Sequence, residues 1–555
     1  MEAKKWWKEA VVYQIYPRSF CDSNGDGIGD INGIRSKLDY VKRLGITCIW
    51  LSPIFQSPQD DNGYDISDYR AIAPEFGTMA DFEHLLREAH ERDIRILMDL
   101  VVNHTSDEHP WFQESRKSKE NPYRDYYIWR DGKTDGKPPS DWGSHFSGSA
   151  WEYDAQTDQY YLHLFSKKQP DLNWENPRVR QEVRDIIHFW SKKGVDGYRI
   201  DTVCMYSKNM DFPDTGEEHR LAVEHFNDGP KMHDYLQELH DHGFEPYDAM
   251  TVGEANNIPI ERALRYVGED RKELSMLFHF EHVNLGGKYD TWTPEAITPQ
   301  RIKTIFSRWQ TAMHEEKGWN TLYWSNHDQP RVVSRFGDDT TYWKESAKML
   351  ATILHLQKGT PFIYQGEEIG MTNVPFQRDE YRDIEAIRFL NDYEQKHGSV
   401  STILEAAAAT NRDNARTPMQ WNARKNAGFT TGMPWIKIAP NFQSINVQAE
   451  EADPDSILHY YQALVQLRKD HPVIIYGKYQ DVDLDHPQVY AFLRIDQDET
   501  LLVIANMTKE HVTYALPKEL EGKKGEILLK NGTAVALAPE MNLPPYACMV
   551  YRLLG

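Results

Sequence analysis

ILMDLVVN at residues 96–103 and GYRIDTV at residues 197–203 are built in the same way. In each, a short apolar or aromatic run ends in carboxylate or amide side chains. Such runs are typical of strands buried on both faces of a parallel sheet. Six similar runs lie at residues 11–16, 48–53, 250–254, 276–282, 322–327 and 361–365. Eight parallel strands are the number that closes a barrel.

Helical patterns occur between these runs. Residues at helical spacing between the first two strands are Ile34, Leu38, Val41 and Leu44. After the second strand, Thr78 and Asp81 have the spacing of a capping box, ahead of an apolar stripe formed by Met79, Phe82, Leu85, Leu86 and Ala89. Strands that alternate with helices predict an α/β fold, here a (β/α)8 TIM barrel.

Two regions depart from this alternation. Residues 105–172 are rich in Trp, Tyr, Gly, Ser, Lys and Pro and lack a long helical pattern, which predicts a small domain inserted after the third strand. The short alternating runs at 489–495, 501–505 and 548–553 predict a C-terminal antiparallel β-sandwich. We therefore expect a barrel formed by residues 1–104 and 173–472, an inserted domain at 105–172 and a C-terminal domain at 473–555.

Composition narrows the function classes. The net charge of −22 disfavours nucleic acid and anionic lipid as partners and suits a small neutral substrate, although solubility alone also accounts for it. The 16 Trp and 30 Tyr suit sugar stacking or core packing. The N-terminus lacks a secretory signal, no apolar run is long enough for a membrane helix, and the four Cys form no CxxC pair. We expect a soluble cytoplasmic protein, monomeric or weakly dimeric, with reduced thiols.

Ionisable and other polar residues gather where the predicted strands end. They are Asp99, Asn103 and His104 on the third strand, Arg199 and Asp201 on the fourth, Glu254 on the fifth, and His327 and Asp328 on the seventh. The carboxyl ends of barrel strands converge on one face, where active sites lie. A single Asp at a strand end is usually a helix cap, but a set drawn from four strands indicates a catalytic site.

Two of these carboxyl groups suit glycoside hydrolysis. The reaction needs one carboxylic acid to protonate the leaving oxygen and one carboxylate to meet the developing oxocarbenium ion. Asp201 and Glu254 supply the pair. Arg199, two residues before Asp201, points to the same face of a strand, so we expect its cation to keep Asp201 ionised.

Several motifs carry a family resemblance. DLVVNHTS (99–106), GYRIDTV (197–203), TVGEA (251–255) and SNHDQPR (325–331) resemble, in order and spacing, the four signature regions of the α-amylase family of glycoside hydrolases. QPDLNWEN (169–176) is similar to a fifth region typical of the oligo-1,6-glucosidase and maltase branch. The similarity extends from VYQIYPRSF near the start to NARTPMQW near position 420.

The resemblance implies a retaining enzyme without a catalytic cofactor. It assigns Asp201 as the nucleophile, Glu254 as the general acid/base and Asp328 as the group that holds the sugar's 2- and 3-hydroxyls. It also implies that His104 and His327 bind the sugar and that Arg199 orients Asp201. The other substrate-binding residues it suggests are Asp61 and Arg412 at the non-reducing end, with Arg416 as the alternative arginine, Tyr64 stacking on the ring, Gln169 from the fifth region, Thr202 on the pocket wall, and the inserted domain's Phe146 and Phe165. The two phenylalanines suit an aromatic clamp or the insert's own core equally.

A metal site is predicted in the loop DSNGDGIGD (22–30), where oxygen-bearing side chains alternate as in calcium loops. The loop lacks the Glu of an EF-hand, since Gly33 stands at position twelve. By resemblance to a metal loop of this branch, the predicted ligands of a structural Ca²⁺ or Mg²⁺ are Asp22, Asn24, Asp26, Asp30 and the Ile28 carbonyl. The alternative is a solvated acidic turn.

The substrate class follows from the residue after the nucleophile. Isomaltase-like members tend to carry Val there, and maltase-like members Thr, Ala or Gly, so Thr202 favours a maltase acting on α-1,4 links, with sucrose as a further substrate. The alternatives are an oligo-1,6-glucosidase, a trehalose-6-phosphate hydrolase, which would need extra cations, and a sucrose isomerase. A non-enzymatic alternative is a transporter-associated ectodomain, which carries a membrane helix and lacks the full catalytic set.

Overall fold

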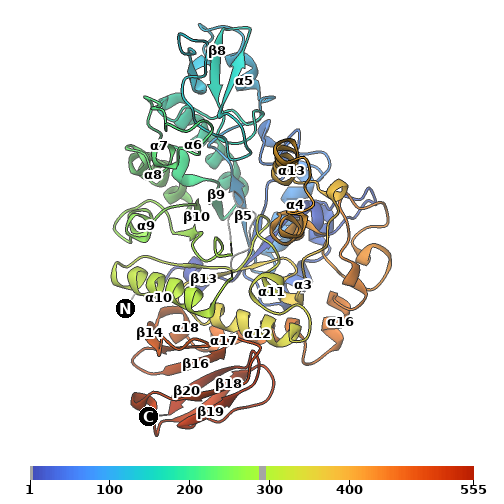
Figure 1. Ribbon diagram of the computed structural model, residues 1–555, viewed down its shortest axis with the longest axis vertical. Coiled ribbons are helices and arrows are strands. Elements are labelled where there is room, and N and C mark those ends of the chain that lie inside the picture. The colour runs from blue at the N-terminus through green and yellow to red at the C-terminus, as the bar shows by residue number, and fades with distance from the viewer. Residues whose placement is uncertain (1–3, 287–295, 555) are drawn as a thin grey trace.

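The computed structural model describes residues 4–286 and 296–554 (Figure 1). Its centre is an eight-stranded sheet in the order β11-β10-β9-β5-β2-β1-β13-β12. The strands are β1 (Val12–Ile15), β2 (Cys48–Leu51), β5 (Arg95–Leu100), β9 (Gly197–Ile200), β10 (Met250–Ala255), β11 (Met276–His279), β12 (Thr321–Leu322) and β13 (Thr360–Tyr364). All neighbouring pairs are parallel, and a single parallel bridge between Leu277 and Asn320 closes the ring. The predicted (β/α)8 barrel is confirmed.

Helices cover the outside of the barrel. The main ones are α2 (Ile31–Arg35), α3 (Leu38–Arg43), α4 (Met79–His90), α6 (Pro177–Lys193), α8 (Met232–Leu239), α9 (Ile260–Val267), α10 (Pro299–Glu315), α12 (Trp343–His355) and α17 (Ile457–Asp470). The capping box of Thr78 and Asp81 at the start of α4 is present as predicted. Beyond β13 the chain adds α13 (Ile384–His397), α14 (Leu404–Thr410) and α15 (Asp413–Arg416) before α17.

Two predicted elements differ clearly from the structure, and the strands expected at 96–103 and 276–282 end earlier, at Leu100 and His279. The helix expected over residues 34–44 is divided into α2 and α3, because Lys37 leaves helical geometry and the Ser36 hydroxyl donates to the Gly33 carbonyl. The seventh strand, expected at 322–327, is only the two residues of β12. The chain turns away from the sheet there, and the Asn326 side chain accepts a hydrogen bond from the Asp328 backbone N–H at 2.7 Å.

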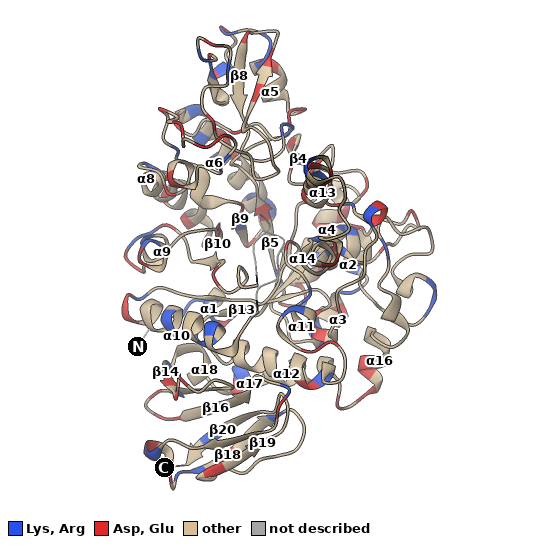
Figure 2. Ribbon diagram, viewed as in Figure 1, with Lys and Arg blue, Asp and Glu red and all other residues tan. Residues whose placement is uncertain are grey.

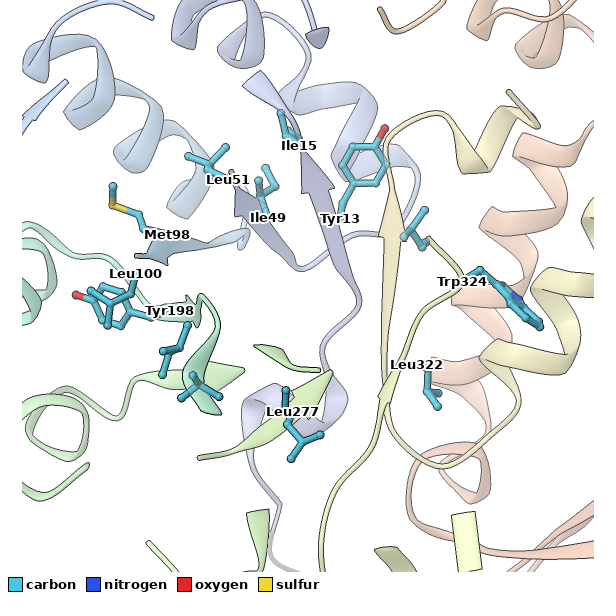
Figure 3. Packing of buried hydrophobic residues seen from close by; sticks show 14 of the residues in the cluster. Tyr13, Ile15, Ile49, Leu51, Met98, Leu100, Tyr198, Leu277, Leu322 and Trp324 are labelled. Atoms are coloured by element: carbon cyan, nitrogen blue, oxygen red, sulfur yellow. The ribbon is translucent and has the colours of Figure 1, made fainter. Parts of the chain in front are cut away.

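Side chains of the barrel strands alternate between two cores. Tyr13, Ile15, Ile49, Leu51, Met98 and Leu100 point outward and pack in the layer beneath the helices (Figure 3). Their neighbours Val12, Cys48, Trp50, Leu97, Val252 and Phe278 fill the barrel interior. In this alternation Asp99, Arg199 and Glu254 share the inward face, since Asp99 pairs with Arg199 and Arg199 with Val252 across the sheet. Strand register therefore places charged side chains above the apolar interior.

Two further units flank the barrel (Figure 1). The insert contains α5 (Pro110–Ser115) and an antiparallel sheet of β6 (Trp129–Arg130), β8 (Gln159–Leu162) and β7 (Trp151–Asp154). The C-terminal unit is a five-stranded antiparallel sheet of β14 (Lys478–Val482), β15 (Val489–Ile495), β16 (Thr500–Asn506), β20 (Cys548–Leu554) and β18 (Lys524–Lys530). The pair β17 (Val512–Ala515) and β19 (Glu540–Leu543) packs with it around one apolar cluster.

The C-terminal sheet is joined to the barrel by a buried arginine. Arg494 on β15 donates to the Leu356 carbonyl after α12 and to the Ile474 and Gly477 carbonyls. Charges of both signs are mixed over the helices and the two flanking units (Figure 2). Within residues 4–286 and 296–554, none of the helices has the length and apolarity needed to cross a bilayer.

Candidate active site

Arg199 lies at the centre of the charged layer, and its side chain is 2% exposed. Its Nη1 donates to Asp99 Oδ1 and to Asp201 Oδ1, both at 2.7 Å, and its Nη2 contacts Glu254. Burial alone would lower the pKa of Arg199, but the surrounding carboxylates outweigh it and hold the pKa well above its usual value. One guanidinium therefore holds the carboxyl groups of three neighbouring strands.

Burial dominates the titration of the two predicted catalytic groups. It raises the pKa of Asp201 to about 6, although Arg199 and a hydrogen bond from Glu254 oppose the rise. Burial raises the pKa of Glu254 to about 7, again against Arg199, while the charges of Asp201 and Asp328 add to the rise. Desolvation is the larger effect, but a pKa of about 6 leaves Asp201 mostly ionised near pH 7, so the expectation that Arg199 helps to keep Asp201 ionised stays a prediction. The burial and the neighbouring carboxylates that raise the pKa of Glu254 suit a group that must carry a proton to act as the acid.

Thr202 contacts both carboxyl groups. Its backbone N–H donates to Glu254 Oε2 and its hydroxyl donates to Asp201 Oδ2, both at 3.3 Å. The residue has φ of 39° and ψ of 42°, a left-handed conformation that costs a β-branched residue about 1–3 kcal/mol. This strained geometry aims the N–H at Glu254.

His104, Gln169 and Asp61 form a chain along one side of the site. Gln169 Nε2 donates to Asp61 Oδ2 at 3.1 Å and lies 3.3 Å from His104 Nε2. Burial lowers the pKa of His104 to about 4, so the imidazole is neutral near pH 7. Tyr64 donates to Asp99 Oδ2 at 3.0 Å and stacks on His327, with ring centroids 5.2 Å apart.

Asp328 is held by cations on the opposite side. Its Oδ1 accepts from Arg416 at 2.9 Å and from Arg412 at 3.3 Å, and its Oδ2 lies 3.0 Å from His327 Nε2. Burial raises the pKa of Asp328, but His327 and the two arginines outweigh burial and keep it well below its usual value. Asp328 is therefore a permanent carboxylate.

These groups surround a pocket of about 800 Å³. The predicted residues that line it are Asp61, Tyr64, His104, Phe146, Phe165, Asp201, Thr202, Glu254, Asp328 and Arg412. Four others, Gln169, Arg199, His327 and Arg416, lie behind this wall and contact it through Asp61, Asp201, Tyr64 and Asp328 respectively. Phe146 lies beneath Arg412 and packs on Phe165, so both rings belong to the pocket wall.

Sequence reasoning missed two acids that hold Arg412. Asp383, the cap of α13, contacts the Arg412 guanidinium, and Glu385 Oε2 lies 3.4 Å from Arg412 Nε. Glu385 lines the pocket, and burial raises its pKa to about 8 against the opposing charge of Arg412. The available signal was RDIEAIRFL, in which two acids stand at the start of an amphipathic helix, but the segment does not directly follow a strand.

A third missed residue, Lys208, lies beneath the site. Its Nζ donates to Asn103 Oδ1 at 3.0 Å and to the Met205 carbonyl at 2.6 Å, and it lies 3.0 Å from Asp171 Oδ2. Asn103 in turn lies 3.2 Å from both His104 Nδ1 and Asp171 Oδ2. This network joins the end of the insert to the third and fourth barrel strands.

In the predicted metal loop, side-chain oxygens accept hydrogen bonds from the loop's own backbone N–H groups. Asp22, Asn24 and Asp26 each accept hydrogen bonds from N–H groups of residues 24–28, and Asp30 accepts from Ser23 and Gly33. In the described ranges no group of three or more His, Cys, Asp and Glu side chains is arranged to hold a metal ion. The loop atoms that could bind a metal ion are carboxylate, amide and carbonyl oxygens, which suit a hard cation. Metal binding therefore stays a prediction.

Comparisons with known proteins agree with the fold and the site. The family described as "Alpha amylase, catalytic domain" matches residues 14–477, and "Alpha-amylase SusG C-terminal domain" matches residues 489–550. An oligo-1,6-glucosidase of Bacillus cereus is 54% identical over 99% of this chain and 100% of its own. A trehalose-6-phosphate hydrolase of Bacillus subtilis (strain 168) is 48% identical over 100% and 99% of the two chains.

Solved structures agree with these sequence matches. The trehalose-6-phosphate hydrolase of Bacillus licheniformis superposes with a TM-score of 0.95 at 48% identity and covers 100% of both chains. The isomaltulose synthase of Erwinia rhapontici NX5 has a TM-score of 0.96 at 44% identity, also over 100% of both chains. On this evidence, the chain belongs to the α-amylase family of glycoside hydrolases, glycoside hydrolase family 13.

Proposed function

We propose that this protein is a retaining oligo-1,6-glucosidase, which releases terminal glucose from short α-1,6-linked oligosaccharides. The main support for glycoside hydrolysis is that one guanidinium, that of Arg199, contacts both Asp201 and Glu254 at one pocket. The linkage is supported by relatives named oligo-1,6-glucosidase, at 53% and 54% identity over 99% of this chain.

The proposed mechanism has two steps. Asp201 attacks the anomeric carbon while Glu254 protonates the departing glycosidic oxygen, which gives a glucosyl ester and a free sugar. Glu254, now ionised, removes a proton from water, and the resulting hydroxide displaces Asp201. A retaining enzyme needs its two carboxyl groups about 5–5.5 Å apart. Both groups contact the same Arg199 guanidinium and come from the neighbouring strands β9 and β10, which supports a close spacing.

The far end of the pocket suits a terminal glucose. Asp61, Asp328, Asp383 and Glu385 all contact Arg412, so the ion cluster closes the pocket beyond the sugar. Carboxylates and guanidinium groups in fixed positions are strong partners for hydroxyl groups. We propose that Asp61, Asp328 and Arg412 bind the hydroxyls of the non-reducing glucose.

The preference for α-1,4 links predicted from Thr202 is not favoured by the relatives. The argument assumed that the Thr202 hydroxyl is available to the substrate. In the structure that hydroxyl donates to Asp201, so it acts inside the catalytic pair. The α-1,6 alternative therefore becomes the main proposal.

The charge of the pocket argues against trehalose-6-phosphate as the substrate. Five carboxyl groups line the pocket (Asp61, Asp201, Glu254, Asp328 and Glu385) with two guanidinium groups (Arg220 and Arg412). Arg412 is held by acids, and Arg220 is paired with Glu224. A phosphate would find both of these guanidinium groups already paired with carboxylates. A neutral disaccharide needs no such cation.

Initial rates on isomaltose and maltose test the linkage. We expect kcat/KM on isomaltose to exceed that on maltose by at least about tenfold, a difference of 1.4 kcal/mol between the two transition states. Trehalose-6-phosphate and sucrose serve as further substrates, with chromatography of the sucrose products. A preference for maltose would restore the original prediction, and isomaltulose formation from sucrose would indicate an isomerase.

We further propose that the loop at residues 22–30 binds Ca²⁺ through Asp22, Asn24, Asp26, Asp30 and the Ile28 carbonyl. Removing the ion with EDTA should lower the melting temperature by about 2 °C or more, and added Ca²⁺ should restore it. Asp22→Asn should abolish the response. An equal melting temperature with EDTA and with Ca²⁺ would contradict the proposal. Cytoplasmic location and a monomeric or weakly dimeric state remain predictions from the sequence.

A further inference from the structure

The positions of Asp201 and Glu254 depend on the loops that follow them. Asp201 leads into the short 3-10 helix Val203–Met205, and Glu254 leads through Asn256 into α9. Asn256 lines the pocket. A contact that ties these two loops together would therefore fix the separation of the two carboxyl groups.

Asn227 makes such a contact. Its Nδ2 donates to the Asn256 carbonyl at 3.0 Å, and its Oδ1 accepts from the Cys204 thiol at 3.6 Å. Cys204 is buried within the loop that follows Asp201, residues 202–208, which we call the nucleophile loop. Its Sγ also lies 3.8 Å from the Asn256 carbonyl. One amide side chain thus bonds the loop after Asp201 and the loop after Glu254.

The next residue strengthens this connection. The Asp228 backbone N–H donates to the Cys204 carbonyl at 2.7 Å. Its carboxylate accepts from the Tyr266 hydroxyl at 2.6 Å and pairs with Arg262, and both residues lie on α9. Asp228 therefore connects the nucleophile loop to the helix that follows Glu254.

The segment at Gly229 also packs closely against the nucleophile loop. A Cβ added to Gly229 would lie 2.3 Å from the Ser207 carbonyl oxygen, so a larger residue would push the segment away. Neither Asn227 nor Asp228 lines the pocket, so neither is placed to touch substrate.

We propose that Asn227 is a positioning residue that sets the separation of Asp201 and Glu254 by holding their loops together. The proposal rests on the catalytic roles given to those two residues under the proposed function. A misplacement of about 1 Å can cost about 100-fold in rate, and the retaining reaction depends on a narrow carboxylate spacing. The Asn227 amide therefore acts on catalysis through geometry alone.

Asn227→Ala tests the proposal on a chromogenic aryl α-glucoside, which does not depend on linkage. We expect kcat to fall about tenfold or more and KM to change less than about twofold, because the ion cluster around Arg412 that binds the glucose is untouched. Asn227 is only partly buried, so its truncation leaves no large cavity. If Asn227→Ala does not fold, Asn227→Ser, which keeps a hydrogen-bonding group, should fold and show the same change to a smaller extent.

The pH profile separates positioning from general destabilisation. Burial sets the high pKa of Glu254, Arg199 opposes it, and the charges of Asp201 and Asp328 add to it. Cys204 and Tyr323 are the other titratable groups whose charge interacts with that of Glu254. If the two loops separate, the contribution of Asp201 weakens and the pKa of Glu254 falls. Glu254 must be protonated to act as the acid, so the alkaline limb of kcat/KM should move to lower pH in Asn227→Ala.

Asn446→Ala is the matched control. Asn446 is also an amide bonded to backbone groups, at the Ala449 N–H and the Phe442 carbonyl, but it caps α16 (Val447–Ala452) and does not line the pocket. It should lose stability and keep the wild-type kcat and pH profile. A wild-type kcat and alkaline limb in Asn227→Ala would overturn the positioning role. If the wild-type protein did not hydrolyse isomaltose, the linkage proposal would be wrong, but the test of Asn227 on the aryl glucoside would still apply.

Discussion

Asp201→Asn is expected to lower kcat on an α-glucoside by about 10⁴-fold or more, since the amide cannot form the glucosyl ester. Asn has the same shape as Asp and retains an oxygen that can accept from Arg199, which donates to Asp201 at 2.7 Å. The change should therefore remove the nucleophile without removing the pocket. Steady-state rates together with the melting temperature measure the two effects separately.

Glu254→Gln should behave differently from Asp201→Asn. A general acid contributes about 10²- to 10⁴-fold, and its contribution shrinks when the leaving group needs no proton. The variant should therefore be slow on isomaltose but much less impaired in forming the glucosyl enzyme from a glucoside with an acidic phenol as leaving group. A burst of phenol followed by slow turnover would reveal the trapped intermediate.

Asp196→Asn is the control for both variants. Asp196 directly precedes β9 and pairs with His90 and Arg95 at the opposite end of the same strand from Asp201. The amino ends of barrel strands contribute to stability rather than to chemistry, so turnover should remain near wild type. If Asp201→Asn kept more than about a hundredth of the activity, Asp201 would not be the nucleophile and the covalent mechanism would be wrong.

The strands were predictable because their signal is local. The runs at 96–103 and 197–203 are apolar enough to be buried on both faces, and β5 and β9 occupy them. Asp99, Asp201 and Glu254 were also predictable as neighbours, since the ends of parallel strands meet on one face of a barrel. The end of the seventh strand was not, because the apolar residues of 322–324 continue past the point where the chain leaves the sheet.

The residues that sequence reasoning missed act across long stretches of chain. Glu385 reaches the pocket from a helix that follows no strand, and only the tertiary fold brings it to Arg412. The raised pKa of Asp201 could not be predicted for a related reason. The spacing of Arg199 and Asp201 is visible in the sequence, but the depth of burial that outweighs their attraction is not.

Lys208→Met is expected to cost about 3–5 kcal/mol of stability, the usual effect of removing one partner of a buried ion pair. The Lys208 side chain is 1% exposed and that of Asp171 is 0% exposed. Methionine has a similar length but no donors, so Asp171 and Asn103 would lose their shared cation in a site that water does not reach. Because Asn103 also contacts His104 at 3.2 Å, KM should rise together with the loss of stability. Thermal melting and steady-state kinetics on the same preparation measure the two effects.

The double variant Lys208→Met, Asp171→Asn distinguishes charge from packing. If the cost arises from an uncompensated carboxylate, the neutral asparagine should recover a large part of the lost stability, and the two changes should be strongly non-additive. Lys193→Met is the surface control. Its partner Glu83 is 50% exposed, so water can solvate the carboxylate left behind and the loss should be far smaller. Equal losses at Lys208 and Lys193, or additive effects of the two buried changes, would mean that the buried ion pair does not hold the insert against the barrel.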